Sequence, residues 1–180
     1  MPYHPQQYWQ RRGQSYTQAP PRCEIENLQQ WMWDIKPKSI LEVGSGWGAI
    51  YQALASIGLG HVTTLCDISS EMAQNCASRT GVLPVLWDGV TLPFESDKFE
   101  TVISFNVMLH VELDNIERFI ADHIRVAQKY LFVATYAPAK KPDRLSAHCF
   151  THDYDELFEG LTVSKQYRFN EDRKHWLLTL

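Results

Sequence analysis

Residues 39–48, which read Ser-Ile-Leu-Glu-Val-Gly-Ser-Gly-Trp-Gly, decide the fold of this chain. The first five residues form a short apolar run typical of a buried strand, and three glycines then alternate with other residues. Apolar side chains next recur at Ile50, Leu54 and Ile57, the spacing of one helix face. A strand, a glycine-rich loop and a helix in this order predict a ligand site, because glycines let a ligand approach the backbone and the helix offers free N–H groups.

Short apolar strands alternate with amphipathic helices over most of the chain. The expected strands cover residues 39–43, 62–66, 84–87, 101–105 and 130–135. The expected helices cover residues 23–34, 49–57, 70–79 and, from a capping box at 114–117, up to about 127. Continuously apolar strands are typical of a parallel sheet buried on both faces. The pattern therefore predicts an α/β fold.

The C-terminal part differs from this pattern. Residues 153–158 are expected to form a short helix, and residues 162–169 and 175–180 are two β-like runs. The loop between these runs is too short for a parallel crossover, so the two strands must pair antiparallel. We therefore expect a doubly wound, seven-stranded, mostly parallel sheet. Its one reversed strand is the last, which is expected to be antiparallel and to lie at an edge.

Length, charge and cysteine usage narrow the class of protein. At 180 residues the chain is expected to form an N-terminal arm over residues 1–22 and a single domain over residues 23–180. The net charge of −4 disfavours a nucleic-acid partner. No apolar run is long enough to span a membrane. The N-terminus lacks the apolar core of a secretion signal, and the four cysteines form no Cys-x-x-Cys pair, so we expect a cytoplasmic protein with reduced thiols. The sequence does not indicate an oligomeric state.

Two acidic residues stand at the ends of expected strands. Asp67 ends the second strand, and Asp88, followed by Gly89, ends the third. Ligands of doubly wound sheets bind beyond the carboxyl ends of the strands, where a carboxylate can accept hydrogen bonds from ribose hydroxyls. The three glycines follow a Gly-x-Gly-x-Gly spacing, which disfavours the alternative of a nicotinamide oxidoreductase because dinucleotide sites favour Gly-x-Gly-x-x-Gly. These features indicate an adenosine with its ribose at Asp67 and its base near Asp88.

Three segments resemble successive motifs of the class I S-adenosylmethionine-dependent methyltransferases. They read ILEVGSGWG over residues 40–48, VTTLCDISSEM over residues 62–72 and VLWDGVTLPFESDKFETVISFNVMLHV over residues 85–111. The resemblance covers about residues 38–180 and is closest to the small-molecule, methyltransferase type 11-like group. It implies a Rossmann-like fold, S-adenosyl-L-methionine as cofactor and a small-molecule acceptor. Glu100 departs from the family, which usually has Asp before the fourth strand.

The resemblance also implies which residues contact the methionine and ribose parts of the cofactor. The loop residues that would line the methionine part are Gly44, Ser45, Gly46 and Gly48. Glu42 would lie behind this loop and orient it, although a carboxylate here could also only cap a turn. Asp67 would hold the ribose hydroxyls, and it could also act as a helix cap.

Further positions would contact the adenine and the methyl group. The residues implied around the adenine are Ile68, Met72, Asp88 and Gly89. Asp88 could instead be a solvated loop acid. Phe105 and Asn106, at the end of the fourth strand, would close the site beside the methyl group.

Three histidines follow the fourth and fifth strands. His110 is the candidate catalytic residue, because a neutral imidazole at this edge could take a proton from the acceptor; alternatively it only packs the loop. His148 and His152 have His-x-x-x-His spacing, but Thr151 looks like a helix cap between them. We therefore expect no metal site, and we expect His148 to line the acceptor pocket.

The N-terminal arm holds more aromatic residues than a disordered tail would. We expect Tyr8, Trp9 and Arg12 to fold over the cofactor as a lid that excludes water. The alternative is a tail that packs against nothing.

Methyl transfer from a sulfonium is an in-line displacement, so the protein mainly aligns the reactants and no catalytic residue is obligatory. The end of the fourth strand lacks the Asn/Asp-Pro-Pro-aromatic run usual in enzymes that methylate base amino groups, and no Pro-Cys pair occurs. The sequence therefore favours a methyltransferase acting on a small molecule. A protein acceptor, or a non-catalytic S-adenosylmethionine-binding partner or regulatory protein, remains an alternative.

Overall fold

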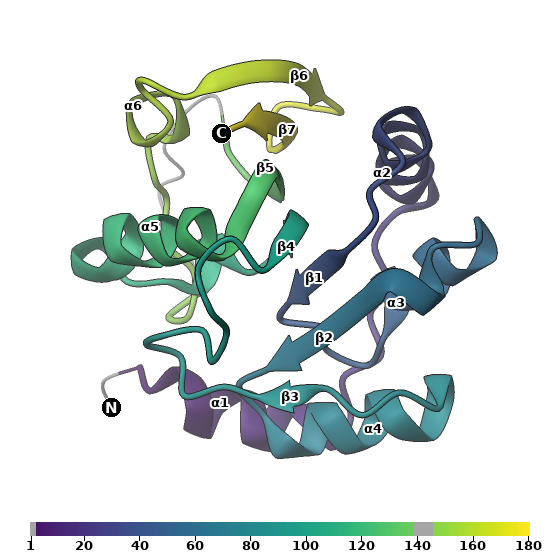
Figure 1. Cartoon of the computed structure of the whole chain (residues 1–180). Helices are drawn as coiled ribbons and strands as arrows, with labels where there is room; N and C mark the ends of the chain where they lie inside the picture. The colour runs from purple at the N-terminus through teal and green to yellow at the C-terminus, as the bar shows by residue number, and fades with distance from the viewer. Residues whose placement is uncertain (1–2, 139–145) are drawn as a thin grey trace. The chain divides into compact units, whose positions relative to one another are not determined.

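The computed structural model describes residues 3–138 and 146–180 (Figure 1). The chain divides into two compact units, one ending at Pro93 and the other beginning at Phe94. The seven strands have the order β3-β2-β1-β4-β5-β7-β6. The predicted doubly wound, Rossmann-like α/β fold with a mostly parallel sheet is confirmed.

The unit that ends at Pro93 contains three strands and four α-helices. In chain order they are α1 (Pro5–Gly13), α2 (Arg22–Ile35), β1 (Ile40–Val43), α3 (Ala49–Ser56), β2 (Thr63–Asp67), α4 (Ser70–Thr80) and β3 (Val85–Leu86), with a 3-10 turn at Gly60–Val62 before β2. The three strands are parallel, with Val43 opposite Cys66 and Cys66 opposite Val85. All four residues of β1 are buried, as its continuous apolar run predicts for a strand covered on both faces.

The unit that begins at Phe94 contains the other four strands. Its elements are β4 (Phe99–Phe105), two 3-10 turns at Met108–His110 and Leu113–Asn115, α5 (Ile116–Val126), β5 (Ala127–Tyr136), α6 (Tyr154–Leu157), β6 (Thr162–Arg168) and β7 (Arg173–Thr179). β4 runs parallel to β5, whereas β7 runs antiparallel to both β5 and β6. The predicted C-terminal hairpin is therefore present (Figure 1).

Three local features differ from the sequence analysis. The reversed strand was expected at an edge, but β7 lies between β5 and β6, so the edge strand is β6. The capping box expected at 114–117 does not form, because the N-cap residue of α5, Asn115, makes no side-chain capping bond. The N-terminal arm also contains a helix, α1, that the sequence analysis did not predict.

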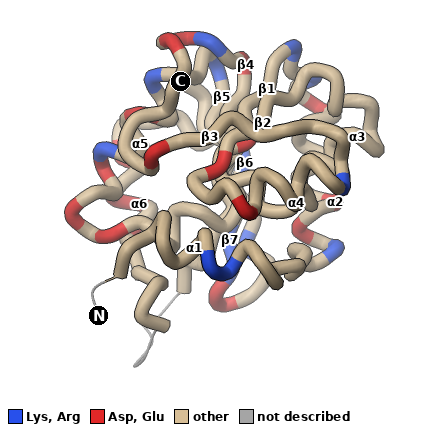
Figure 2. The backbone as a smooth tube through the Cα atoms, turned by 90° about the horizontal axis from the view of Figure 1, so that it is seen from below, with Lys and Arg blue, Asp and Glu red and all other residues tan. Residues whose placement is uncertain are grey.

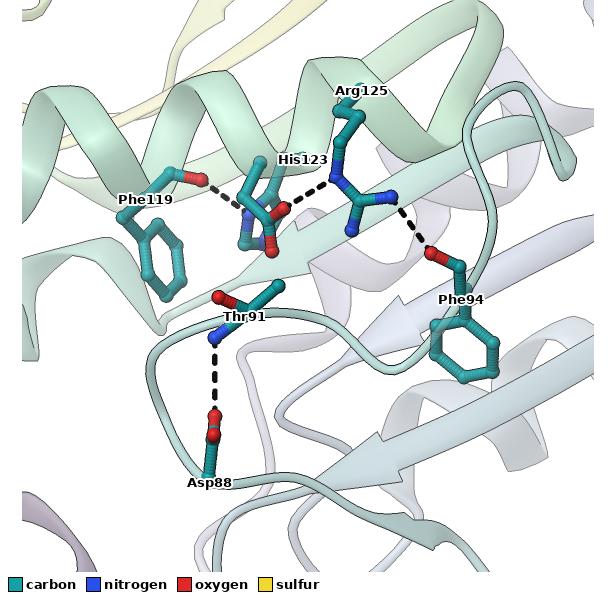
Figure 3. A network of polar contacts seen from close by, with 7 residues as sticks. Asp88, Thr91, Phe94, Phe119, His123 and Arg125 are labelled. Carbon is teal, nitrogen blue, oxygen red and sulfur yellow. Dashed lines mark hydrogen bonds and ion pairs between the residues drawn. The ribbon is translucent and has the colours of Figure 1, made fainter.

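The helix α5 carries a histidine, His123, on its buried face (Figure 3). His123 is fully buried, and its Nδ1–H donates to the Phe119 carbonyl at 2.7 Å. Nε2 of His123 has no hydrogen-bond partner among the described residues. Burial therefore lowers the pKa of His123 to about 4 and keeps the imidazole neutral. Nearby, Arg125 joins the Asp122 carboxylate to the Phe94 carbonyl, with both contacts at 2.7 Å, and so ties α5 to the loop before β4.

The neutral His123 predicts loss of stability in acid. In the unfolded chain His123 takes up a proton near pH 6.5, whereas in the folded chain it does so only near pH 4. The free energy of unfolding should therefore fall as the pH is lowered from 6.5 to 4, by up to about 3 kcal/mol from this residue. Urea unfolding of His123→Leu should show a smaller loss over this range. His61→Leu, at an exposed position, is the control and should behave like the parent. An unchanged pH dependence in His123→Leu would contradict the assignment.

Candidate functional site

The glycine-rich loop after β1 is fixed by hydrogen bonds to the end of β2. The backbone N–H groups of Gly44 and Ser45 both donate to the Cys66 carbonyl, at 2.9 and 3.1 Å. The Gly46 N–H donates to Oδ2 of Asp67 at 2.8 Å. The predicted loop and the predicted acid therefore lie in direct contact, joined by a backbone-to-carboxylate hydrogen bond.

Two glycines of this loop are needed for different reasons. Both have left-handed backbone, with φ of +53° at Gly46 and +91° at Gly48, which disfavours residues that carry a Cβ. A Cβ on Gly48 would lie 2.6 Å from Cγ2 of Thr80 and 2.9 Å from Sγ of Cys76, so this glycine lets the loop pack against α4. A Cβ on Gly46 would meet nothing within 4 Å. Open space therefore faces the backbone at Gly46, where a ligand can approach.

Two buried carboxyl groups lie behind the loop. Asp67 is 4% exposed, and burial raises its pKa to about 6, although backbone N–H groups of Ser69 and Gly46 oppose the rise. Glu42 is 2% exposed, and burial, reinforced by the charge of Asp67, raises its pKa well above the usual range. Oε2 of Glu42 has no hydrogen-bond partner among the described residues. A donor group on a ligand would stabilise the charged form of either carboxyl group.

The start of α4 lies next to Asp67. Ser69 is the N-cap residue, and its Oγ accepts from the Met72 N–H at 3.2 Å, while its own N–H donates to Oδ1 of Asp67 at 2.9 Å. Met72 is buried, and a Cβ on Gly89 would lie 2.7 Å from Cδ1 of Ile68. The residues expected around the adenine thus include one close pair, Ile68 and Gly89.

The exposed Asp88 has a local structural role. Its Oδ1 accepts from the N–H groups of Val90 and Thr91, at 2.8 and 3.1 Å, so the side chain closes a turn after β3 (Figure 3). The loop-acid alternative is compatible with these bonds. Contact with an adenine stays a prediction.

The N-terminal helix α1 docks on α4 through polar contacts (Figure 1). The Gln10 amide donates to Oγ of Ser70 at 2.8 Å and accepts from the Ser70 N–H at 3.2 Å. Oγ of Ser69 donates to the Trp9 carbonyl at 3.2 Å. At the end of α1, a Cβ on Gly13 would lie 2.7 Å from Cβ of Glu71, so only glycine allows this approach. The arm is therefore attached to the turn that holds Asp67.

Aromatic rings continue along the arm. Trp9 makes edge-to-face contacts with Tyr8 and Tyr16, at centroid distances of 5.1 and 5.8 Å, and the Arg12 guanidinium lies 5.5 Å from the Tyr16 ring. Tyr8 and Trp9 are half-buried, whereas Arg12 is exposed. The three residues expected to form a lid thus belong to one docked segment.

The glycine-rich loop is also tied to the segment between α1 and α2. The indole N–H of Trp47 donates to the Gln18 carbonyl at 3.2 Å. The guanidinium of Arg79, on α4, lies 4.9 Å from the centre of the Trp47 ring. The loop, α4 and the N-terminal segment therefore form one connected structure.

In the unit that begins at Phe94, the end of β4 carries the other predicted residues. Phe105 is buried, and Asn106 has a left-handed backbone, with φ of +59°. The Asn106 N–H donates to the Ala134 carbonyl at 2.7 Å, and its side-chain oxygen accepts from the Arg173 guanidinium. Such a backbone is uncommon outside glycine and is held here by partners on β5 and β7.

Glu100 forms an ion pair at the other end of β4. Its carboxylate lies 2.7 Å from Nζ of Lys129 on β5. The departure from the usual Asp therefore falls on a residue that links two neighbouring strands.

His110 and His148 lie together. Nδ1 of His110 donates to the His148 carbonyl at 2.8 Å, and the two rings stack with centroids 5.3 Å apart. Burial lowers the pKa of His110 to about 4, so its imidazole is neutral at physiological pH. Cys149, which the sequence analysis did not single out, has its Sγ 3.9 Å from Nδ1 of His110.

Sequence reasoning missed the contacts that join distant segments. Gln10 reaches Ser70 across sixty positions, and Arg173 reaches Asn106 across sixty-seven. Nothing in the spacing of these polar residues indicates such pairs. The adjacent His148 and Cys149 are a visible signal of metal-ligating residue types, but the nearness of His110 to them depends on tertiary structure.

Structures of known proteins share this fold. Magnesium protoporphyrin IX methyltransferase (ChlM) from Synechocystis PCC 6803, with bound SAH, is similar with a TM-score of 0.70 and 16% identity, over 99% of this chain and 89% of that one. The structure of the same protein with bound SAM gives a TM-score of 0.68 at 16% identity, over 96% and 89%. A SAM-dependent methyltransferase from Aquifex aeolicus gives 0.62 at 15% identity, over 89% and 98%. A search of the curated proteins found no match.

The fold is thus that of the class I S-adenosylmethionine-dependent methyltransferases, as predicted. The methyltransferase domain family matches residues 40–129, which is half of the chain, and the chain belongs to this family. The match includes β1, the glycine-rich loop, Asp67 and β4. The predictions of a methyltransferase and of S-adenosylmethionine as its cofactor are confirmed at the level of the family.

Alanine substitutions at the two loop glycines should differ in their main effect, on stability at Gly48 and on ligand binding at Gly46. Gly48→Ala should lower the free energy of unfolding by about 2–4 kcal/mol, because it combines backbone strain with a clash against α4. Gly46→Ala should cost only about 1–2 kcal/mol from strain, yet weaken binding of S-adenosylhomocysteine strongly, because its methyl group occupies the open space. Urea unfolding and calorimetry measure the two effects. Equal stability loss in both variants, with unchanged affinity in Gly46→Ala, would show that the loop is only structural.

Proposed function

We propose that this chain transfers a methyl group from S-adenosylmethionine to a small-molecule acceptor. The observation that carries the proposal is the open backbone face at Gly46, which lies directly against the buried Asp67 carboxylate.

The residues of the first unit fit the polar groups of this cofactor. The unpartnered Oε2 of Glu42 is a buried acceptor that suits the charged side of the methionine part. Each oxygen of Asp67 already accepts one backbone N–H and keeps a further lone pair for a ribose hydroxyl. Ile68 and Met72 supply apolar surface for the adenine. S-adenosylmethionine, when bound, supplies a methyl group already activated on its sulfonium.

The lid role that we propose for α1 rests on its position. Asp67 is only 4% exposed and Trp9 is bonded to the neighbouring Ser69, which supports a role in which α1 would exclude water from a ribose bound at Asp67. Entry of a cofactor would then require α1 to shift. The polar character of its anchors at Gln10 suits a contact that opens and closes.

The residues of the second unit suit alignment of an acceptor more than acid–base chemistry. Arg173 holds the Asn106 side chain in one orientation. The neutral His110 can take a proton, but its low pKa makes it a weak base. An in-line displacement mainly needs the acceptor held in the correct geometry, so we assign His110 and His148 to the acceptor side as positioning groups.

Charge favours a small-molecule acceptor over a nucleic acid. Lys and Arg segments are interspersed with Asp and Glu segments along the described chain (Figure 2). The formal net charge is −4, whereas a phosphate backbone requires a concentrated basic surface.

No helix within residues 3–138 and 146–180 is long and apolar enough to cross a membrane.

Ligand-dependent melting tests the proposal first. Because a ligand that binds only the folded state raises stability by about 2.7 kcal/mol at a hundred times its Kd, S-adenosylhomocysteine should raise the melting temperature by about 5–10 °C. NAD should have no effect.

Transfer of a labelled methyl group is then measured with phenols, amines, carboxylic acids and thiols, and with a protein extract. Stabilisation by NAD alone would contradict the cofactor, label only in the extract would indicate a protein acceptor, and binding without any transfer would indicate a regulatory protein.

The raised pKa of Asp67 predicts that cofactor affinity depends on pH. In the chain without ligand, the Asp67 carboxyl group has a pKa of about 6. Ribose hydroxyls donate more favourably to its charged form, so the Kd of S-adenosylhomocysteine should fall about tenfold between pH 5 and pH 7. Asp67→Asn should bind weakly at both values, with little pH dependence. Glu26→Gln, at an exposed position of α2, should retain the dependence of the parent. Calorimetry at both pH values decides, and a parent Kd that does not change would contradict the ribose role.

A further inference from the structure

Three metal-ligating side chains meet in the unit that begins at Phe94. One ring nitrogen of His110, one of His148 and the sulfur of Cys149 all lie within 4.8 Å of one another. All three residues are half-buried. They come from two separate loops, the one after β4 and the one before α6.

Backbone hydrogen bonds hold these loops together. The Phe150 N–H donates to the Leu109 carbonyl at 2.8 Å, which places the residue after Cys149 beside the residue before His110. The His110 N–H donates to the Val107 carbonyl at 2.9 Å and closes the 3-10 turn. The backbone therefore brings His110, His148 and Cys149 to one place.

The pair expected from sequence spacing is not the pair that the fold brings together. Nε2–H of His152 donates to the Met108 carbonyl at 3.2 Å, and His152 is not one of the three residues whose ligand atoms meet. His148 instead stacks on His110, and Cys149 approaches the same ring. The His-x-x-x-His pattern thus contributes one member of the cluster.

We propose that His110, His148 and Cys149 bind a zinc ion. Two imidazoles and one thiolate are a donor set that zinc prefers, whereas magnesium and calcium require oxygen ligands. A zinc ion with three protein ligands keeps a fourth position open for water or for a donor atom of another molecule. The site is separate in sequence from the glycine-rich loop, and the proposal does not depend on methyl transfer.

The spacing of the ligand atoms fits a metal-free form of such a site. Zinc lies about 2.0–2.1 Å from nitrogen and about 2.3 Å from sulfur, so tetrahedral ligand atoms are about 3.3–3.8 Å apart. Sγ of Cys149 is already 3.9 Å from Nδ1 of His110. The largest separation allowed in the cluster, 4.8 Å, closes by side-chain rotation of about 1 Å.

Nδ1 of His110 carries a proton when no metal is bound. A carbonyl oxygen only accepts, so Nδ1 carries the proton that the His148 carbonyl receives at 2.8 Å. Two electron-rich atoms, this oxygen and the Cys149 sulfur, therefore face one ring nitrogen. On zinc binding, the hydrogen bond from Nδ1 to the His148 carbonyl breaks and its proton moves to Nε2 of the same ring. Nδ1 becomes the ligand, and the Cys149 thiol releases its proton to solvent. One proton is thus released for each ion bound.

Titration of the tag-free full chain with metal, after removal of metals by a chelator, tests the proposal. Cobalt(II) replaces zinc as a spectroscopic probe, and a thiolate-to-cobalt absorption band should appear with one equivalent and disappear when zinc is added. Zinc affinity should rise as the pH is raised towards the thiol pKa, because binding releases a proton.

Substitutions assign the ligands. Cys149→Ser should abolish the thiolate band, and Cys149→Ser, His148→Ala and His110→Gln should each weaken zinc binding by at least about a hundredfold, since even outer-shell partners are worth ten- to a hundredfold. Cys23→Ser and His61→Ala, at exposed positions of the other unit, are matched controls and should bind like the parent. Circular dichroism checks that each variant is folded.

Two results would overturn the proposal: a parent chain that binds no zinc more tightly than the Cys149→Ser variant, or a thiolate band that survives in that variant. Binding of S-adenosylhomocysteine is measured on the same samples. Its persistence without zinc binding would reject the metal site alone, whereas zinc binding without it would reject only the proposed cofactor.

Discussion

One carboxylate organises the part of the chain that we propose to bind the cofactor. Asp67 accepts the Gly46 N–H with one oxygen and the Ser69 N–H with the other, so a single side chain fixes both the glycine-rich loop and the first turn of α4. These bonds stabilise the charged form of a carboxyl group that burial would otherwise keep neutral. The balance places the pKa at about 6, so the site changes charge close to neutral pH.

Much of the fold could be predicted because its signals are local. β1 is a continuous apolar run buried on both faces, and the short loop before β7 allows only antiparallel pairing with β6. The loop length does not determine which strand of the hairpin pairs with β5. That choice depends on side-chain packing across the sheet, and in the structure the fully buried Leu178 of β7 lies opposite Leu131 of β5. The edge position was therefore wrong although the pairing was right.

The candidate site likewise contains contacts that the local sequence predicts and contacts that it does not predict. Gly46 and Asp67 belong to successive segments of one motif, so their contact follows from the order of strand, loop and strand. The docking of α1 does not, because the helix is short and mostly polar and is anchored by polar atoms of Gln10 and by the close approach of Gly13 to α4. Periodicity detects apolar faces and does not detect such contacts. Cys149 joins His110 through loop geometry, which residue spacing also does not encode.

The position of Trp47 has a consequence for how occupancy of this loop can be observed. Its indole donates to the Gln18 carbonyl and lies under the Arg79 guanidinium, between two glycines of the loop. Tryptophan emission is sensitive to hydrogen bonding and to nearby charge, and this ring experiences both from segments that meet at the loop. One of the six tryptophans of the chain therefore lies inside the glycine-rich loop, and the difference in emission between the parent and a Trp47→Phe variant isolates the signal of this ring.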